Sequence, residues 1–192
     1  MPAVPATLRQ GDAGPQVRAL QQRLSDLGYW TGDADGVFGP DTHHAVVALQ
    51  KAAGLGRDGI VGPATQGALD RGVRPVPHSH SGRVVEIDLD HQLLIVARDG
   101  RVELVFDTST GTAAGSTPAG QWTVTREIDG LRRSRLGLLY RPKYFYEGVA
   151  VHGYTSVPPY PASHGCVRVT YPAMDHIWRA GLMPVGTLVL VY

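Results

Sequence analysis

The sequence is poor in cysteine, in net charge and in long hydrophobic runs, and each of these shortages argues against a structural feature or a class of function. Its 192 residues include one cysteine, Cys166, so no disulfide can form within the chain and cysteine usage says nothing about the redox compartment. The formal net charge is +1, which gives no support for nucleic-acid binding, because that function needs a strong basic excess. No apolar run reaches the roughly 18 residues of a membrane-spanning helix, so we expect no membrane span.

The N-terminal stretch "MPAVPATLRQ" lacks the charged and then apolar layout of a secretory signal. If the protein works outside the cytoplasm, we expect its signal segment to be missing from this chain. With 43% hydrophobic and 18% charged residues, the composition is that of a globular protein. The length suits one large domain or two small ones.

The chain reads as two halves of different character. Residues 7–73 show helical periodicity, whereas residues 83–192 alternate apolar and polar residues as β-strands do. Residues 74–82, rich in Pro, His and Ser, have the composition of a linker. We therefore expect a multi-domain protein: a small all-α three-helix domain, then a mainly-β domain, built as a sandwich or partly closed barrel, with one short helix.

The first half contains an internal repeat. "DGVFGPDTHHAV" (35–46) and "DGIVGPATQGAL" (58–69) align without gaps. In each, Asp-Gly predicts a tight turn, two apolar residues enter the core, and proline stands where a helix starts, since the first helical position needs no N–H. Before them, "GPQVRALQQRLSDLG" predicts a helix with one apolar face. The residues expected to start or end helices are Pro40, Pro63, Gly28 and Gly54.

These motifs resemble the peptidoglycan-binding domain of the three-helix type over residues 7–72. The matching segments are "LRQGDAGPQVRALQQRLSDLGY", "GVFGPDTHHAVVALQKAAGL" and "DGIVGPATQGAL". The resemblance implies non-catalytic attachment to cell-wall peptide or glycan. The candidate ligand contacts are Tyr29, Trp30, Asp33 and Asp35.

The second half predicts a β-rich domain. In "VVEIDL", Val85 and Ile87 are expected to face the core, while Glu86 and Asp88 face away from it. Asp-Gly at 99–100 between two apolar runs predicts a hairpin. The further expected elements are strands within 115–128, 148–153 and 186–192, the last buried on both faces, and a helix within 171–181.

Cys166 is the residue around which chemistry is most readily predicted. His164 lies two residues before it, and His152 ends the predicted strand at 148–153. Three interpretations are open from spacing alone: a small buried hydrophobe, a zinc ligand together with both histidines, or a nucleophile whose proton a histidine takes. Gly153 and Gly165 would leave backbone room for a substrate and for N–H donors to an oxyanion.

The string "SHGCVR" (163–168), preceded by "HG" (152–153), resembles the signature of the L,D-transpeptidase catalytic domain. The segments "VVEIDLDHQLLIVARDG", "STG" and "TPAGQWTV" match as well, so the resemblance covers residues 83–192. Tyr154 departs from the pattern, because many members carry Thr or Ser after His-Gly. A wall-binding domain ahead of such a domain points to the same polymer.

The resemblance implies a reaction on peptidoglycan. Cys166 would attack the bond between diaminopimelate and D-Ala of a tetrapeptide stem, and the thioester would pass to a neighbouring stem amine as a 3→3 cross-link. His152 would be the general base, oriented by a carbonyl near Gly153, although the sequence leaves His152 and His164 open for this role. The N–H groups of Gly165 and Cys166 would form the oxyanion hole.

The remaining implied roles concern the substrate. Arg168 would bind a substrate carboxylate, Ser163 would support the loop by a hydrogen bond, and the backbone of Tyr154 would face the substrate. The aromatic and basic residues expected to wall a groove are Tyr140, Arg141, Lys143, Tyr144, Phe145 and Tyr146. The resemblance implies no metal or cofactor, a location in the bacterial envelope, and covalent inhibition by carbapenem β-lactams.

Two other functions are compatible with the sequence. The same site with water as acceptor would make an L,D-carboxypeptidase, because acceptor choice depends on pocket shape. A protein whose second domain is inert would be a purely wall-binding protein.

Overall fold

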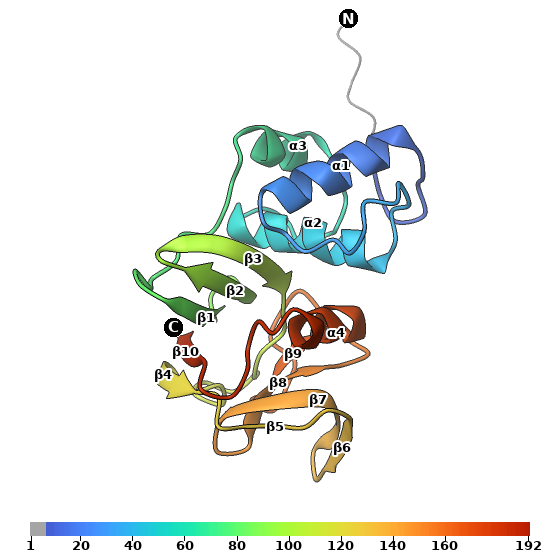
Figure 1. The fold of residues 1–192 in the computed structure, drawn as a ribbon. Coiled ribbons are helices and arrows are strands. Elements are labelled where there is room, and N and C mark those ends of the chain that lie inside the picture. Colours follow the sequence, from blue (N-terminus) through green and yellow to red (C-terminus); the bar gives the residue numbers. More distant parts are fainter. Residues whose placement is uncertain (1–6) are drawn as a thin grey trace, which may run out of the picture. The chain divides into compact units, whose positions relative to one another are not determined.

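The computed structural model describes residues 7–192, which form two compact units, one ending at Pro75 and one beginning at Val76 (Figure 1). Most of the N-terminal stretch without a signal layout, residues 1–6, lies outside the described residues. In residues 7–192 no helix has the length and apolar character needed to cross a membrane.

The first unit consists of three helices, as the sequence predicts. They are α1 (Pro15–Asp26), α2 (Pro40–Ala52) and α3 (Pro63–Asp70). Each begins with proline after a glycine, and the expected stops after α1 and α2 are confirmed, since Gly28 and Gly54 have φ of 89° and 64°.

A buried glutamine organises each repeat of this unit, which the sequence pattern does not reveal. The Gln21 amide nitrogen donates to the Asp35 carboxylate, the Val37 carbonyl and the Thr42 hydroxyl, and its oxygen accepts from Gly36 N–H. One side chain thus ties the Asp-Gly turn to the start of the next helix. The second repeat uses the same set, namely Gln50, Asp58, Ile60, Thr65 and Gly59.

Two of the candidate wall contacts therefore have structural roles. Asp35 also accepts from Val37 N–H, and these hydrogen bonds lower the pKa of its carboxyl. Tyr29 is fully buried and its hydroxyl donates to the Val73 carbonyl.

The second unit contains two open sheets and one helix, so the mainly-β prediction with a short helix is confirmed and the partly closed barrel is wrong. The first sheet has the order β3-β2-β1-β10-β4 and the second β5-β7-β8-β9, with β6 on β7. The elements are β1 (Arg83–Asp88), β2 (Leu93–Arg98), β3 (Arg101–Asp107), β4 (Gly120–Thr123), β5 (Arg126–Glu127), β6 (Leu131–Ser134), β7 (Gly137–Tyr146), β8 (Val149–Gly153), β9 (Val167–Val169), α4 (Tyr171–Arg179) and β10 (Leu188–Val191).

Two burial expectations are wrong. In β10 only Val189 and Val191 are buried, whereas Leu188 is 37% exposed, so the strand buries one face. In β1 Glu86 is fully buried instead of facing solvent. Its carboxylate accepts hydrogen bonds from the backbone of His78, the backbone and hydroxyl of Ser79 and the Tyr192 hydroxyl, which compensate its burial.

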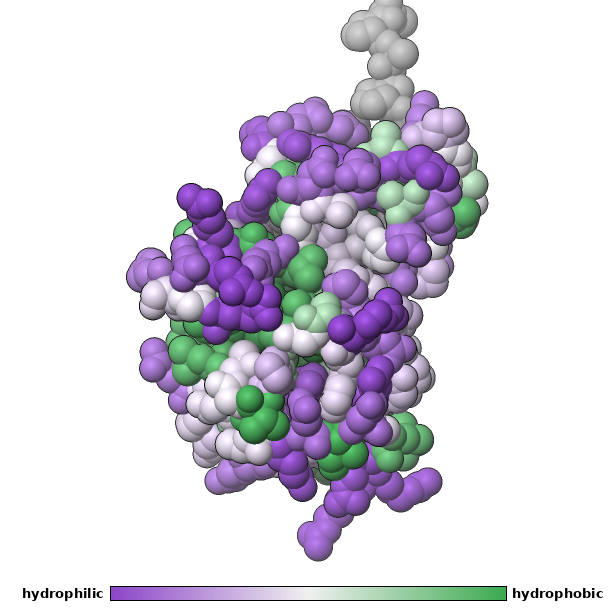
Figure 2. Space-filling view, in the orientation of Figure 1, coloured by the Kyte–Doolittle hydropathy of each residue, from purple (hydrophilic) through white to green (hydrophobic). Residues whose placement is uncertain are grey.

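The hairpin of β6 and β7 carries exposed apolar side chains among arginines. Leu131, Leu136 and Leu138 are 58%, 69% and 39% exposed. Figure 2 shows hydrophobic surface beside strongly hydrophilic side chains at the bottom of the view, where Figure 1 draws this hairpin.

Candidate active site

Parallel pairing of β8 with β9 brings the histidine and the cysteine together. Val151 lies opposite Val167 and His152 opposite Arg168, so Cys166, just before β9, stands beside the strand that carries His152. Ser109 forms a further bridge to Arg168 on the other side of β9. The register places Cys166 level with Ala150, two residues before His152 on the neighbouring strand.

The His152 ring is held in one tautomer. It is 4% exposed, and Nδ1 lies 2.9 Å from the Gly153 carbonyl. Because a carbonyl only accepts, Nδ1 carries the proton and Nε2 keeps a lone pair. Burial lowers the pKa of His152 to about 4, the Gly153 carbonyl opposes this, and the charge of Arg168 adds to it. At neutral pH the ring is an uncharged proton acceptor.

The Cys166 thiol rests in an apolar surrounding. It packs against the buried cluster of Leu139, Tyr144 and Ala150, and Sγ lies 3.8 Å from the Gly148 carbonyl. Burial raises the pKa of the thiol, opposed by the Ala150 N–H and by the charge of Arg168. The resting sulfur is therefore protonated at neutral pH, and a base would have to take its proton before it could act as a nucleophile.

Ser163 fixes the loop before the cysteine. Its hydroxyl donates to the Cys166 carbonyl at 2.6 Å and accepts from the Gly165 N–H at 2.9 Å. The Gly165 N–H is thus engaged by the Ser163 hydroxyl, which argues against its expected role as an oxyanion donor. Gly165 is needed for space instead, because a Cβ there would lie 2.5 Å from the Ser116 carbonyl oxygen.

Arg168 packs against Tyr154. The guanidinium lies over the tyrosine ring, 4.2 Å from its centroid, and Arg168 Nε is buried without a hydrogen-bond partner. Tyr154, the residue that differs from the family pattern, thus provides the ring against which the Arg168 guanidinium packs. Gly153 is required by packing, since a Cβ would lie 2.8 Å from Tyr140 and 2.9 Å from Tyr171.

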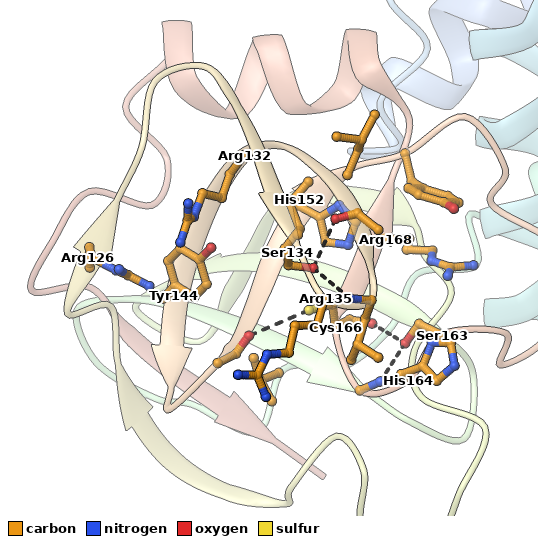
Figure 3. A pocket seen from close by; sticks show the side chains of 18 residues that line it. Arg126, Arg132, Ser134, Arg135, Tyr144, His152, Ser163, His164, Cys166 and Arg168 are labelled. Carbon is orange, nitrogen blue, oxygen red and sulfur yellow. Dashed lines mark hydrogen bonds between the residues drawn. The ribbon is translucent and has the colours of Figure 1, made fainter.

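A cavity of about 550 Å³ opens beside Cys166 (Figure 3). Of the eight site residues expected from the sequence, seven line it and Gly153 does not. The seven are His152, Tyr154, Ser163, His164, Gly165, Cys166 and Arg168. His164 is exposed there, whereas His152 is buried.

The prediction that residues 140–146 wall the groove is mostly wrong. Only Tyr144 of that segment lines the cavity. Arg141 instead pairs with Asp129 and Asp175, and Lys143 is buried, with Nζ 2.6 Å from the Glu127 carboxylate. Arg126 and the β6–β7 hairpin also line the cavity, which the sequence does not predict; the hairpin contributes Arg132, Ser134, Arg135, Leu136, Gly137, Leu138 and Leu139. The one available signal was the basic run "LRRSRLG".

The zinc alternative has no geometric support. Among residues 7–192, no three His, Cys, Asp or Glu side chains are grouped so that they could hold a metal ion. His152, His164 and Cys166 are therefore not arranged as ligands of one ion.

The fold and the site define a two-domain protein with a helical first domain and a cysteine–histidine site on a mainly-β second domain. Residues 13–69 match the putative peptidoglycan binding domain, and residues 82–191 match the L,D-transpeptidase catalytic domain. The chain belongs to the L,D-transpeptidase family.

Solved structures give the same family. An L,D-transpeptidase from Xylanimonas cellulosilytica is 51% identical, with a TM-score of 0.94 over 100% of both chains. One from Stackebrandtia nassauensis is 26% identical, with a TM-score of 0.57 over 96% of this chain and 94% of the other. An L,D-transpeptidase in complex with imipenem, 19% identical over 58% and 59% of the two chains, shares the fold with a TM-score of 0.50.

Curated relatives match over short segments. An N-acetylmuramoyl-L-alanine amidase of Mycobacterium tuberculosis is 50% identical over 56 residues, which are 29% of this chain and 14% of the relative. A probable N-acetylmuramoyl-L-alanine amidase of Bacillus licheniformis is 48% identical over 64 residues, 32% of this chain and 18% of that relative. The chain spans less than a fifth of the length of either relative.

Proposed function

We propose that the protein is a peptidoglycan L,D-transpeptidase that works through a Cys166 thioester. Sγ attacks the carbonyl between the L-centre of diaminopimelate and the terminal D-Ala of a tetrapeptide stem. The C–N bond breaks, D-Ala leaves, and the stem remains as a thioester. The side-chain amine of a neighbouring stem then attacks this thioester, which restores the thiol and forms a 3→3 cross-link.

The observation that carries the proposal is the state of His152. Its Nδ1 is committed to the Gly153 carbonyl, so an uncharged Nε2 is left as a proton acceptor, and the protonated thiol of Cys166 lines the same cavity. Nε2 takes the Cys166 proton during attack and delivers it to the departing D-Ala amine. His164, exposed at the cavity, positions the substrate or the thiolate.

The backbone and the arginine complete the proposed site. The Cys166 N–H donates to the oxyanion of the tetrahedral intermediate. Arg168, whose guanidinium lies over the Tyr154 ring, binds a stem carboxylate. No step needs a metal or a cofactor.

The first domain supports the same conclusion. We infer that residues 7–73 attach the enzyme to peptidoglycan, that residues 74–82 link this domain to the catalytic domain at 83–192, and that the protein acts in the bacterial envelope. Carbapenem β-lactams would acylate Cys166, since their strained carbonyl meets the same nucleophile.

Tetrapeptide muropeptides provide the test. Incubation followed by mass analysis should give dimers that lack one D-Ala, and Cys166→Ala should give none. Tripeptides alone would mean that water is the acceptor and that the protein is an L,D-carboxypeptidase. D-Ala release by Cys166→Ala would contradict the nucleophile assignment, and no release by the intact protein would favour a purely wall-binding role.

A further inference from the structure

The cavity beside Cys166 is lined by positive charge that carries no compensating carboxylate. In residues 7–192 no Asp or Glu lines it, and no ion pair found there involves its arginines. Other arginines of the same domain are paired, such as Arg98 with Glu103 and Arg141 with Asp129. The four cavity arginines are Arg126, Arg132, Arg135 and Arg168.

Two of these arginines are held in place by aromatic rings. The Arg126 guanidinium lies 4.0 Å from the centroid of Tyr144, and that of Arg168 lies 4.2 Å from the centroid of Tyr154. Figure 3 shows them on opposite sides of Cys166. A guanidinium that contacts a ring through its face can still donate its N–H groups to a carboxylate.

The other two arginines come from the β6–β7 hairpin. Arg132 lies on β6 and Arg135 in the turn, and both line the cavity, whereas Arg133 between them does not. Successive strand residues point to opposite sides, which explains the difference between Arg132 and Arg133. The Ser134 hydroxyl donates to the Gly137 carbonyl and accepts from the Leu136 N–H, which closes the turn that carries Arg135.

We propose that Arg132 and Arg135 make this site select stem peptides with free carboxylates over the same peptides carrying carboxamides. The inference rests on the proposed function and names the charge state of its substrate. A carboxamide has nearly the shape of a carboxylate but no charge, and its NH₂ group faces N–H donors. It therefore loses the charge-assisted, bidentate contact that a guanidinium makes with a carboxylate.

A stem offers two carboxylates besides its terminus, and both present the same chemistry. They are the α-carboxylate of the isoglutamyl residue and the side-chain carboxylate of diaminopimelate. Four synthetic tetrapeptides separate them: the free acid, each single amide and the double amide. In the first turnover, before any acceptor attacks the thioester, D-Ala release measures reaction of the donor stem alone.

We expect kcat/KM for the free acid to exceed that for the double amide by about tenfold, the range of one charge-assisted hydrogen bond. If one single amide has a lower kcat/KM than the free acid and the other does not, the amidated position of the slower peptide is the carboxylate that is bound. The double variant Arg132→Gln/Arg135→Gln should lower kcat/KM for the free acid by about tenfold and leave the double amide nearly unchanged. Its thermal unfolding serves as the control for folding.

Arg133→Gln is the matched control, because it removes the same charge from the same hairpin outside the cavity. It should keep the preference for the free acid. An equal loss in Arg133→Gln would overturn the proposal in favour of general charge attraction. Equal rates on all four peptides would also overturn it while the proposed function stands, and no D-Ala release from any of them would refute both.

Discussion

At the scale of residues, the proposed mechanism depends on the transfer of one proton from Cys166 to His152. Burial lowers the pKa of the imidazole and raises that of the thiol, so the two rest as uncharged groups. An imidazolium–thiolate pair at rest would need the opposite shifts. In the proposed mechanism the proton therefore moves when the sulfur attacks, and the rate depends on an uncharged His152.

This arrangement predicts the acid limb of the pH profile. As the pH falls through the His152 pKa of about 4, the ring takes a proton and ceases to act as base. The kcat/KM for D-Ala release should therefore stay nearly flat from pH 7 to about pH 5 and fall tenfold per pH unit below about pH 4. An inflection near the ordinary histidine value of about 6.5 would contradict it. His164→Ala should keep the same limb, and its loss there would move the base to His164.

Gly165 gives a second prediction at this scale. In Gly165→Ala the new Cβ would meet the Ser116 carbonyl oxygen at 2.5 Å, and φ there is +142°. We expect the free energy of unfolding to fall by about 2 kcal/mol and D-Ala release to fall about a hundredfold, because the loop carrying Cys166 must shift.

Gly115→Ala is its control, since φ is +74° but no atom lies within 4 Å of the added Cβ. It should keep most of the activity. Urea unfolding and D-Ala release measure both variants, and equal activity losses would show that crowding at Gly165 is not the cause.

At the scale of elements, patterns within a few residues predict where helices and turns lie, whereas contacts between distant residues leave little signal in the sequence. Proline after glycine locates every helix of the first domain, and Asp99-Gly100 locates the hairpin of β2 and β3, because these signals act within a few residues. No local pattern predicts the role of Gln21, because its hydrogen-bond partners lie 14 to 21 positions away. The burial of Glu86 and the cavity-facing arginines likewise depend on contacts that no local pattern contains.

Gln21→Leu tests the buried glutamine as an organiser of the repeat. It would leave the Gly36 N–H and the Thr42 hydroxyl without their partner, so we expect the first domain to lose about 3 kcal/mol of unfolding free energy. D-Ala release from soluble tetrapeptide should not change. The exposed neighbour Gln22→Leu serves as the control, and equal calorimetric transitions for the two variants would disprove the assignment.

At the scale of the whole molecule, the segment between the domains is partly bound to the second one. The Glu86 carboxylate accepts from the N–H groups of His78 and Ser79, both within the stretch whose composition predicts a linker. Ring stacking of His78 on Tyr192, with centroids 3.7 Å apart, adds to this anchor. Free chain between the domains is therefore shorter than composition suggests.

Glu86→Gln should release this anchor. An amide replaces the charged acceptor, so we expect amide hydrogen exchange at His78 and Ser79 to accelerate about tenfold or more, while D-Ala release changes little. Glu103→Gln, whose carboxylate pairs with Arg98 at the surface, is the control. Unchanged exchange in Glu86→Gln would mean that the segment is held by other contacts.

The raised pKa of the Cys166 thiol also bears on the lifetime of the protein. Peroxides and other oxidants react with thiolates far faster than with thiols. A sulfur that keeps its proton until a substrate carbonyl arrives is therefore nearly inert between turnovers. Outside a reducing compartment, where no thioredoxin or glutathione repairs a sulfenic acid, the burial that slows ionisation also protects the only cysteine of the chain from irreversible damage.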